Sequence, residues 1–148
     1  MTIKWLTPYL VQSGWEGMFQ LVHEHKVDAV LNVSHRIFLV PPYYHIDEQH
    51  HYHVSSTDDI PDFEGFLQKG ILWIKDRIGH KERVCIHCEA GANRSVVMTV
   101  GYLMSLGIPF EEAYEQVTVD NYHIGINLGI KCWPGHVEKL KCWNWKLT

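Results

Sequence analysis

The 148-residue sequence lacks any apolar run approaching the ~20 residues that a membrane-spanning helix needs. Its start also lacks the basic and then apolar segment of a secretory signal. We therefore expect no membrane partner and a cytoplasmic location. No repeat, low-complexity segment or linker interrupts the chain, and 46% of its residues are hydrophobic. The composition thus predicts a single domain, residues 1–148, with one substantial core.

Cysteine is scarce, with four in the chain, and the positions do not indicate a disulfide framework. Cys132 and Cys142 lie among tryptophans near the C-terminus. Cys85 and Cys88 form a C-x-x-C pair, but no second pair follows to complete a zinc site. We expect Cys85 to be buried in a strand, with a reversible Cys85–Cys88 disulfide under oxidation as the weaker alternative.

Excess positive charge is also absent, because the formal net charge is -4. This balance opposes general nucleic-acid binding. A polar stretch does gather potential metal ligands, but alternating histidines are more typical of a solvated strand edge and loop. We expect no metal and no cofactor there. The residues in question are His45, Asp47, His50, His51 and His53.

The most informative segment, residues 87–95, joins a predicted strand to a predicted helix. The uncharged run at residues 84–86 is typical of a buried parallel strand. After the segment, apolar residues recur at helical spacing from Val96 to Met104. The segment therefore lies at a helix N-terminus, where free backbone N–H groups and the helix dipole favour an anion. Gly91 lets the backbone curl tightly around that anion.

Two side chains in this segment have complementary chemistry for a phosphate. Cys88 is a nucleophile when ionised, and the helix N-terminus stabilises its thiolate form. Arg94 offers a planar fork that holds two phosphate oxygens, which a lysine would not do. We expect Ser95 to donate a hydrogen bond to the sulfur and His87 to order the loop through the backbone. Simple strand-end and helix-start roles are the alternatives for these two residues.

Strands alternate with helices along the rest of the chain. A long helix is expected from Phe63 to about Gly79, and a strand follows from about Arg83. After a break at residues 107–109, another helix is expected from Phe110. The pattern predicts an α/β three-layer sandwich with a central, mostly parallel sheet of four to five strands flanked by helices. A C-terminal helix is expected to pack through Trp133, Trp143 and Trp145, with Lys139, Lys141 and Lys146 in solvent.

The segment HCEAGANRS fills all five fixed positions of the pattern HCxxGxxR[ST]. The chain thereby resembles the cysteine-dependent protein phosphatases, and in size the compact dual-specificity type. Similarity extends to the opening at residues 6–10 and to the strand at residues 27–33. The resemblance implies hydrolysis of phosphotyrosine and phosphoserine or phosphothreonine in proteins, through a cysteinyl-phosphate. It assigns catalysis to Cys88 and Arg94 and phosphate binding to Glu89, Ala90, Gly91, Ala92, Asn93 and Arg94.

The resemblance also implies a general acid on a separate loop ahead of the long helix. That loop contains Asp58 and Asp59. Asp58 fits the placement better and is the predicted acid, with Asp59 as its rival. The alternative is that both merely cap the helix, which Asp62 could do instead.

The substrate is the least determined property. The loop adds no lysine, which disfavours multiply charged inositol lipids. Asn93 resembles the HCxxGxNRT version of cysteine-type RNA triphosphatases, so an RNA 5′ end remains the alternative to a phosphoprotein partner. A phosphate-binding module without turnover is a third hypothesis.

Overall fold

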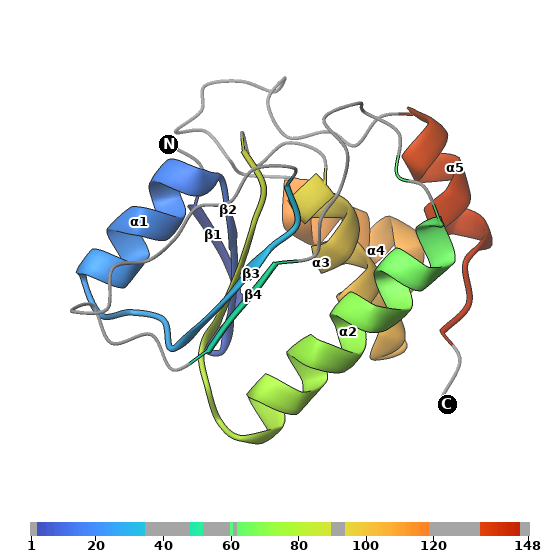
Figure 1. The fold of residues 1–148 in the computed structure, drawn as a ribbon. Coiled ribbons are helices and arrows are strands. Elements are labelled where there is room, and N and C mark those ends of the chain that lie inside the picture. Colours follow the sequence, from blue (N-terminus) through green and yellow to red (C-terminus); the bar gives the residue numbers. More distant parts are fainter. Residues whose placement is uncertain are drawn as a thin grey trace.

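The computed structural model describes residues 3–34, 48–51, 60, 62–89, 94–118 and 134–145 (Figure 1). A five-stranded sheet forms the centre of the fold, with the strand order β1-β2-β5-β3-β4. β1 and β2 are antiparallel, and every other neighbouring pair is parallel. The prediction of a mostly parallel sheet is confirmed. The strands are β1 (Ile3–Thr7), β2 (Leu10–Ser13), β3 (Ala29–Asn32), β4 (Glu48–His51) and β5 (Val84–His87).

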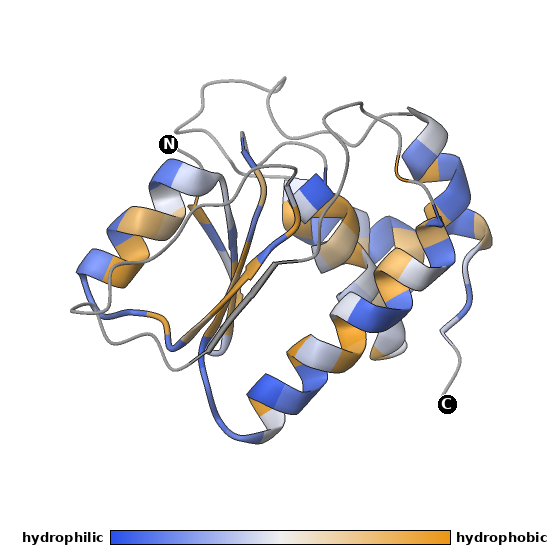
Figure 2. Cartoon of the chain, viewed as in Figure 1, coloured by the Kyte–Doolittle hydropathy of each residue, from blue (hydrophilic) through white to orange (hydrophobic). Residues whose placement is uncertain are grey.

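Helices cover both faces of this sheet, which confirms the three-layer sandwich (Figure 1). α1 packs on one face, and the remaining helices lie on the other. Apolar and hydrophilic residues alternate around the helices, so that each can bury one side (Figure 2). The helices are α1 (Trp15–His23), α2 (Phe63–Gly79), α3 (Arg94–Ser105), α4 (Phe110–Thr118) and α5 (Pro134–Cys142).

Side chains in the strands alternate between the two faces, as the period of two in a β-strand requires. On β5, Val84 and Ile86 pack toward α2 and α3, whereas Cys85 packs with the α1 cluster. On β2, Leu10 joins the first cluster and Val11 the second. Because β5 is the central strand and is buried on both faces, its last residue is held firmly in place.

α2 and α3 approach each other closely because each helix places a glycine opposite a large side chain of the other helix. A β-carbon on Gly70 would overlap the Met98 side chain, and one on Gly101 would lie 2.7 Å from Leu67 Cδ2. The space is therefore filled at the density of a protein interior. This contact fixes where α3 lies relative to α2.

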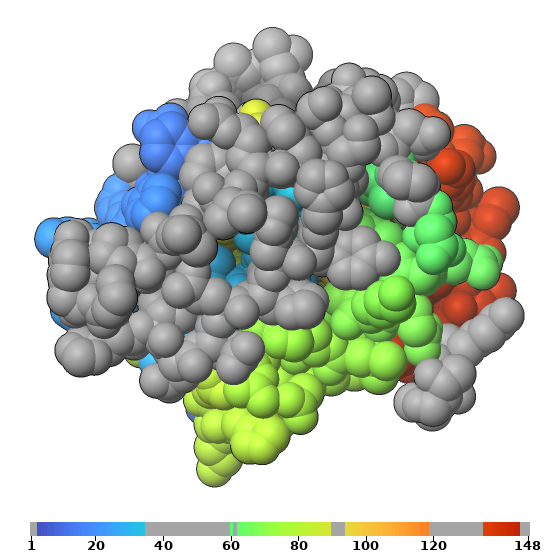
Figure 3. Space-filling model, viewed as in Figure 1, coloured from blue at the N-terminus to red at the C-terminus, as the bar shows by residue number. Residues whose placement is uncertain are grey.

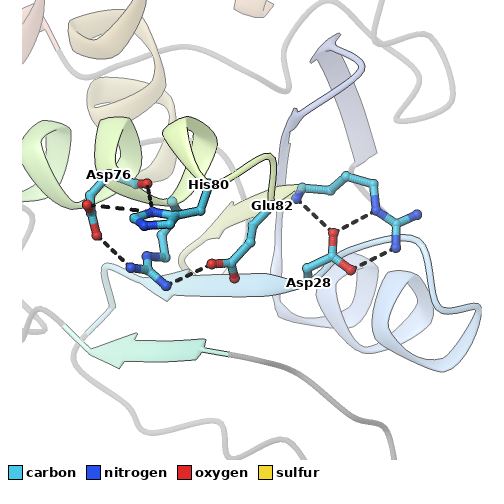
Figure 4. Close-up of polar contacts among 6 residues, drawn as sticks. Asp28, Asp76, His80 and Glu82 are labelled. Atoms are coloured by element: carbon cyan, nitrogen blue, oxygen red, sulfur yellow. Dashed lines mark hydrogen bonds and ion pairs between the residues drawn. The ribbon is translucent and has the colours of Figure 1, made fainter.

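Ion pairs connect neighbouring elements at the start of β5 (Figure 4). Arg83 Nε donates to Asp28 Oδ2 at 2.8 Å, and the Arg83 backbone N–H donates to the same oxygen at 2.9 Å. These hydrogen bonds are the main reason that the pKa of Asp28 lies below its ordinary value. Close by, Arg77 Nη1 donates to Glu82 Oε1 at 2.7 Å. The pairs join α2 and the segment before β3 to the start of β5.

The C-terminal part of the described chain packs as expected. Trp143 is buried in the core and Trp145 packs against it, whereas Lys139 and Lys141 are exposed. α5 lies beside the start of α2 at the surface (Figure 3). A hollow of about 340 Å³ is lined by residues from both of these segments. The described residues that line the hollow are Asp62, Phe63, Glu64, Lys139, Cys142 and Trp143.

Candidate active site

Cys88 directly follows β5, and Arg94 is the first residue of α3. The predicted strand and helix are therefore both present, and Cys88 lies at the carboxyl end of the central strand. In open α/β sheets that end is where ligands bind. The Cys88 side chain is 2% exposed. Of the expected phosphate loop, Ala90, Gly91, Ala92 and Asn93 lie outside the described residues.

The sulfur of Cys88 lies 3.2 Å from the Ser95 hydroxyl oxygen. A thiolate carries no proton, so in the ionised state the serine must be the donor. The contact is the one that the hypothesis for Ser95 requires.

His87 is fully buried, and its ring interacts with the backbone rather than with the sulfur. His87 Nδ1 lies 3.0 Å from the Cys88 carbonyl oxygen, which can only accept, so this nitrogen carries the proton. The carbonyl of His87 in turn accepts from the Val33 N–H at 2.9 Å. The backbone at residues 87 and 88 is therefore held by the His87 ring and by the Val33 N–H, which directly follows β3.

Glu89 connects the loop to the other layer of the sandwich. Its carbonyl accepts a hydrogen bond from the Trp15 N–H, the first residue of α1, at 2.9 Å. The Arg94 side chain is partly exposed at the start of α3. A guanidinium at that position adds full positive charge to the partial charge of the helix N-terminus. The arrangement suits an anion with several oxygens.

Sequence reasoning missed one polar residue next to these groups, Gln12 on β2. Its side chain is fully buried, and Nε2 donates to the Ser95 hydroxyl oxygen at 2.7 Å. The available signal was a carboxamide within an otherwise apolar strand run at residues 10–12. Burying an amide is unfavourable unless it is hydrogen-bonded, so such a residue indicates a specific partner.

Cys85 is buried inside β5, as predicted, and packs on the α1 face, away from the cluster that contains Cys88. Its sulfur lies 3.3 Å from the Ser13 hydroxyl. Burial raises the pKa of the Cys85 thiol to about 12, although the Ser13 contact lowers it in part. Cys85 is therefore a neutral thiol at physiological pH and a poor nucleophile.

The predicted acid Asp58 and its rival Asp59 lie outside the described residues. Asp62 is described, and its carboxylate accepts from the Gly65 N–H at 3.3 Å as the N-cap of α2. The capping role suggested for Asp62 is thus confirmed. In the histidine-rich stretch only the backbone of residues 48–51 is described, as β4. His45, Asp47 and His53, together with Cys132, Trp133 and Lys146, also lie outside the described residues.

No helix among the described residues is long and apolar enough to cross a membrane. Within the same part of the chain, no group of three or more histidine, cysteine, aspartate or glutamate residues is placed to hold a metal ion.

Solved structures of several phosphatases share this fold. The Cydia pomonella PTP-2 phosphatase is 22% identical, with a TM-score of 0.73, and the match covers 94% of this chain and 88% of that one. DUSP15 is 15% identical, with a TM-score of 0.77 and coverage of 94% and 85%. PTPMT1, solved in complex with PI(5)P, is 21% identical, with a TM-score of 0.74 and coverage of 94% and 92%. At these identities the likeness establishes the fold.

No curated protein matches the sequence significantly. A family model does match, namely the catalytic domain of dual specificity phosphatases, over residues 10–133. The matched range includes all the strands except β1 and the whole 87–95 segment. Because the match extends over most of the chain, this protein belongs to the family of dual specificity phosphatase catalytic domains.

Proposed function

We propose that residues 1–148 form a single catalytic domain that removes phosphate from phosphotyrosine and from phosphoserine or phosphothreonine in proteins. The observation that carries this proposal is the Cys88 sulfur, 3.2 Å from the Ser95 hydroxyl, between the end of central strand β5 and the start of α3. A hydroxyl donor and a helix N-terminus together favour a thiolate there. A thiolate facing an anion site is suited to attack on phosphorus.

In the first step the Cys88 thiolate attacks phosphorus in line with the ester oxygen. The S–P bond forms as the P–O bond breaks, and the electron pair of that bond leaves with the oxygen. Arg94 and the loop N–H groups hold the other phosphate oxygens as their charge redistributes. Asp58 is the proposed acid that protonates the departing alcohol or phenol.

In the second step water attacks the cysteinyl-phosphate, and the same aspartate takes its proton. The S–P bond breaks and its electron pair returns to sulfur, so that inorganic phosphate and the Cys88 thiolate are released. The Ser95 hydroxyl assists here, because a hydrogen bond to sulfur stabilises the thiolate as a leaving group. The cycle consumes one water and regenerates the enzyme.

The proposed substrate follows from what surrounds the phosphate. PTPMT1 has been solved with PI(5)P. The 87–95 segment of this chain contains Glu89 and no lysine, which disfavours a headgroup with several negative charges. A single phosphate on a protein side chain suits the segment better. Asn93 keeps the RNA 5′-triphosphate as the second candidate, since it is the residue shared with the HCxxGxNRT pattern.

A side-by-side assay with a phosphotyrosine peptide, a phosphothreonine peptide and triphosphorylated RNA tests the proposal. We expect hydrolysis of both peptides and little release from RNA. Preference for the triphosphate would overturn the assignment to proteins. Absence of hydrolysis, with phosphopeptide affinity retained by Cys88→Ser, would instead identify a binding module.

The acid is tested by comparing Asp58→Asn with Asp59→Asn. Loss of the true acid should remove its limb from the pH dependence of kcat and lower turnover of alkyl phosphates most, because they have the poorer leaving group. The other variant should keep the wild-type profile. If both variants keep it, neither residue is the acid.

A further inference from the structure

Gln12 is the first of three buried residues whose polar contacts lead through Ser95 to the Cys88 sulfur. Gln12 lies on β2 and pairs in register with Ile86 of the central strand β5. Ile86 is two positions before Cys88. The neighbours of Gln12 on β2, Leu10 and Val11, are both buried and apolar. Burying an unpaired carboxamide is unfavourable, so a glutamine in this position calls for a specific hydrogen bond.

That hydrogen bond goes to the Ser95 hydroxyl, with Gln12 Nε2 as donor and Ser95 Oγ as acceptor at 2.7 Å. A hydroxyl has one proton and two lone pairs. Since Gln12 occupies a lone pair, the proton of Ser95 remains available for the Cys88 sulfur, 3.2 Å away. The direction of donation therefore runs from Gln12 to Ser95 to Cys88.

A serine in a helix has another option, which is to donate its hydroxyl proton to a backbone carbonyl in the preceding turn. Thr99 does this, because its hydroxyl donates to the Ser95 carbonyl at 2.7 Å. A donor fixed against Ser95 Oγ from β2 restricts the rotation that such a bond would require. Gln12, Ser95 and Cys88 are all buried, so water does not compete strongly with the hydrogen bonds between them.

We propose that Gln12 is a positioning residue that orients the Ser95 hydroxyl toward Cys88 and thereby stabilises the thiolate. Its proposed route to the sulfur runs through Ser95, the acceptor of its Nε2 hydrogen bond. The role of Gln12 in catalysis rests on the proposed function. The effect of Gln12 on the Cys88 sulfur can be measured without turnover.

The test measures the rate of Cys88 alkylation by iodoacetamide between about pH 4 and pH 9 in the intact chain. Only the thiolate reacts, so the pH at the midpoint of the rate profile reports the stability of the thiolate relative to the thiol. Because Cys142 is exposed, the modification is assigned to Cys88 by tandem mass spectrometry. His87, Glu89 and Arg94, the titratable and charged described neighbours in the segment, stay in place in every variant.

Gln12→Leu removes the donor with an apolar side chain that suits the strand. We expect the alkylation midpoint to rise, with about a three- to tenfold lower rate below it, as expected for one lost hydrogen bond. Ser95→Ala should shift the midpoint at least as far. In the Ser95→Ala background, Gln12→Leu should add nothing, because its route to the sulfur is already gone.

Ser13→Ala is the matched control. Ser13 adjoins Gln12, is fully buried, and contacts Cys85 rather than Cys88, so its loss should leave the Cys88 profile unchanged. If Gln12→Leu does not fold by circular dichroism, Gln12→Met, which keeps the side-chain length, takes its place. An unchanged midpoint in the folded Gln12 variant overturns the inference, as does an additive effect with Ser95→Ala.

This readout separates the inference from the proposed function. A chain that binds phosphate without hydrolysing it would still show the Gln12 effect on alkylation. Conversely, normal phosphatase turnover with no Gln12 effect would overturn the positioning role alone.

Discussion

Cys85 lies in β5 and Cys88 follows it three positions later, directly after the strand, and each sulfur has a serine hydroxyl within 3.3 Å. Their surroundings are otherwise opposite. Cys85 lies inside β5 among the apolar side chains of α1, where burial raises its pKa to about 12. Cys88 lies just past the strand, at the loop that leads to α3. A serine hydroxyl beside the sulfur is therefore common to both cysteines, whereas the start of α3 lies next to the partner of Cys88 alone.

The largest expected effect comes from removing each sulfur in turn. Cys88→Ser should lower the hydrolysis of an aryl phosphate by at least about 10³-fold, because the nucleophile is lost. Cys85→Ser should leave kcat/KM within a few-fold of the wild type. Steady-state assays of both variants check this, and equal losses would end the distinction between the two cysteines.

Next in size is the effect of Arg94→Lys, which keeps the charge beside Cys88 but removes the planar fork. We expect kcat/KM to fall by about 10²- to 10³-fold, because oxygens of the transition state lose paired donors. Kinetics at several phosphopeptide concentrations measure the change. A loss below about threefold would show that charge alone suffices.

The third prediction concerns Cys85 and the stability of the fold at high pH. Its folded pKa of about 12 lies above the ordinary value, so its contribution is complete below about pH 8.5 and is lost as the pH rises toward the folded value. Between about pH 9 and pH 11, the unfolding free energy of the wild type should therefore fall more steeply than that of Cys85→Ala. The extra slope approaches about 1.4 kcal/mol per pH unit.

Urea unfolding at a series of pH values compares these slopes. Tyr102, whose pKa burial also raises, titrates in both proteins and cancels in the comparison. Parallel curves would show that Cys85 ionises as readily in the folded chain as in the unfolded one.

The smallest effect is expected at the opposite end of β5, where charges are paired and no reaction is proposed. Asp28→Asn should lower the unfolding free energy at pH 7 by about 0.5–1 kcal/mol, because the pair with Arg83 is partly exposed. The folded pKa of Asp28 is lowered, so its contribution is present above the ordinary value near ~4 and is lost as the pH falls through the folded value. The unfolding free energies of the wild type and of Asp28→Asn should therefore converge at acid pH.

Turnover of Asp28→Asn provides the control for this end of the strand. It should match the wild type at neutral pH, since Asp28 and Arg83 lie at the start of β5 and Cys88 follows its end. A catalytic defect in a variant that remains folded would mean that the two ends are coupled.

The sequence predicted the fold well because its signals are local. Uncharged runs mark β3 and β5, helical spacing marks α2 and α3, and a glycine and proline mark the break before α4. Cys88, Arg94 and Ser95 could be named from one contiguous motif, although their catalytic roles remain predictions. The edge hairpin of β1 and β2 was not predicted as such.

Gln12 could not be assigned because its partner is 83 positions away along the chain. A polar residue in an apolar strand indicates that a partner exists, but only the parallel pairing of β2 with β5 shows which one. The sequence likewise offers Asp58 and Asp59 without a choice between them, since both occupy the same loop. Long-range pairing and loop geometry are the two properties that local patterns do not contain.

The facing glycines of α2 and α3 bear on how a mutational scan of this protein would be interpreted. A methyl group added at Gly70 or Gly101 would meet the end of the Met98 or Leu67 side chain, which would have to shift within the contact between α2 and α3. α3 carries Arg94 and Ser95 at its first turn, so such a shift would disturb the site from a distance. Inactive variants at these glycines would resemble active-site variants in a screen scored by activity, and a phosphate-binding assay with a stability measurement would be needed to tell them apart.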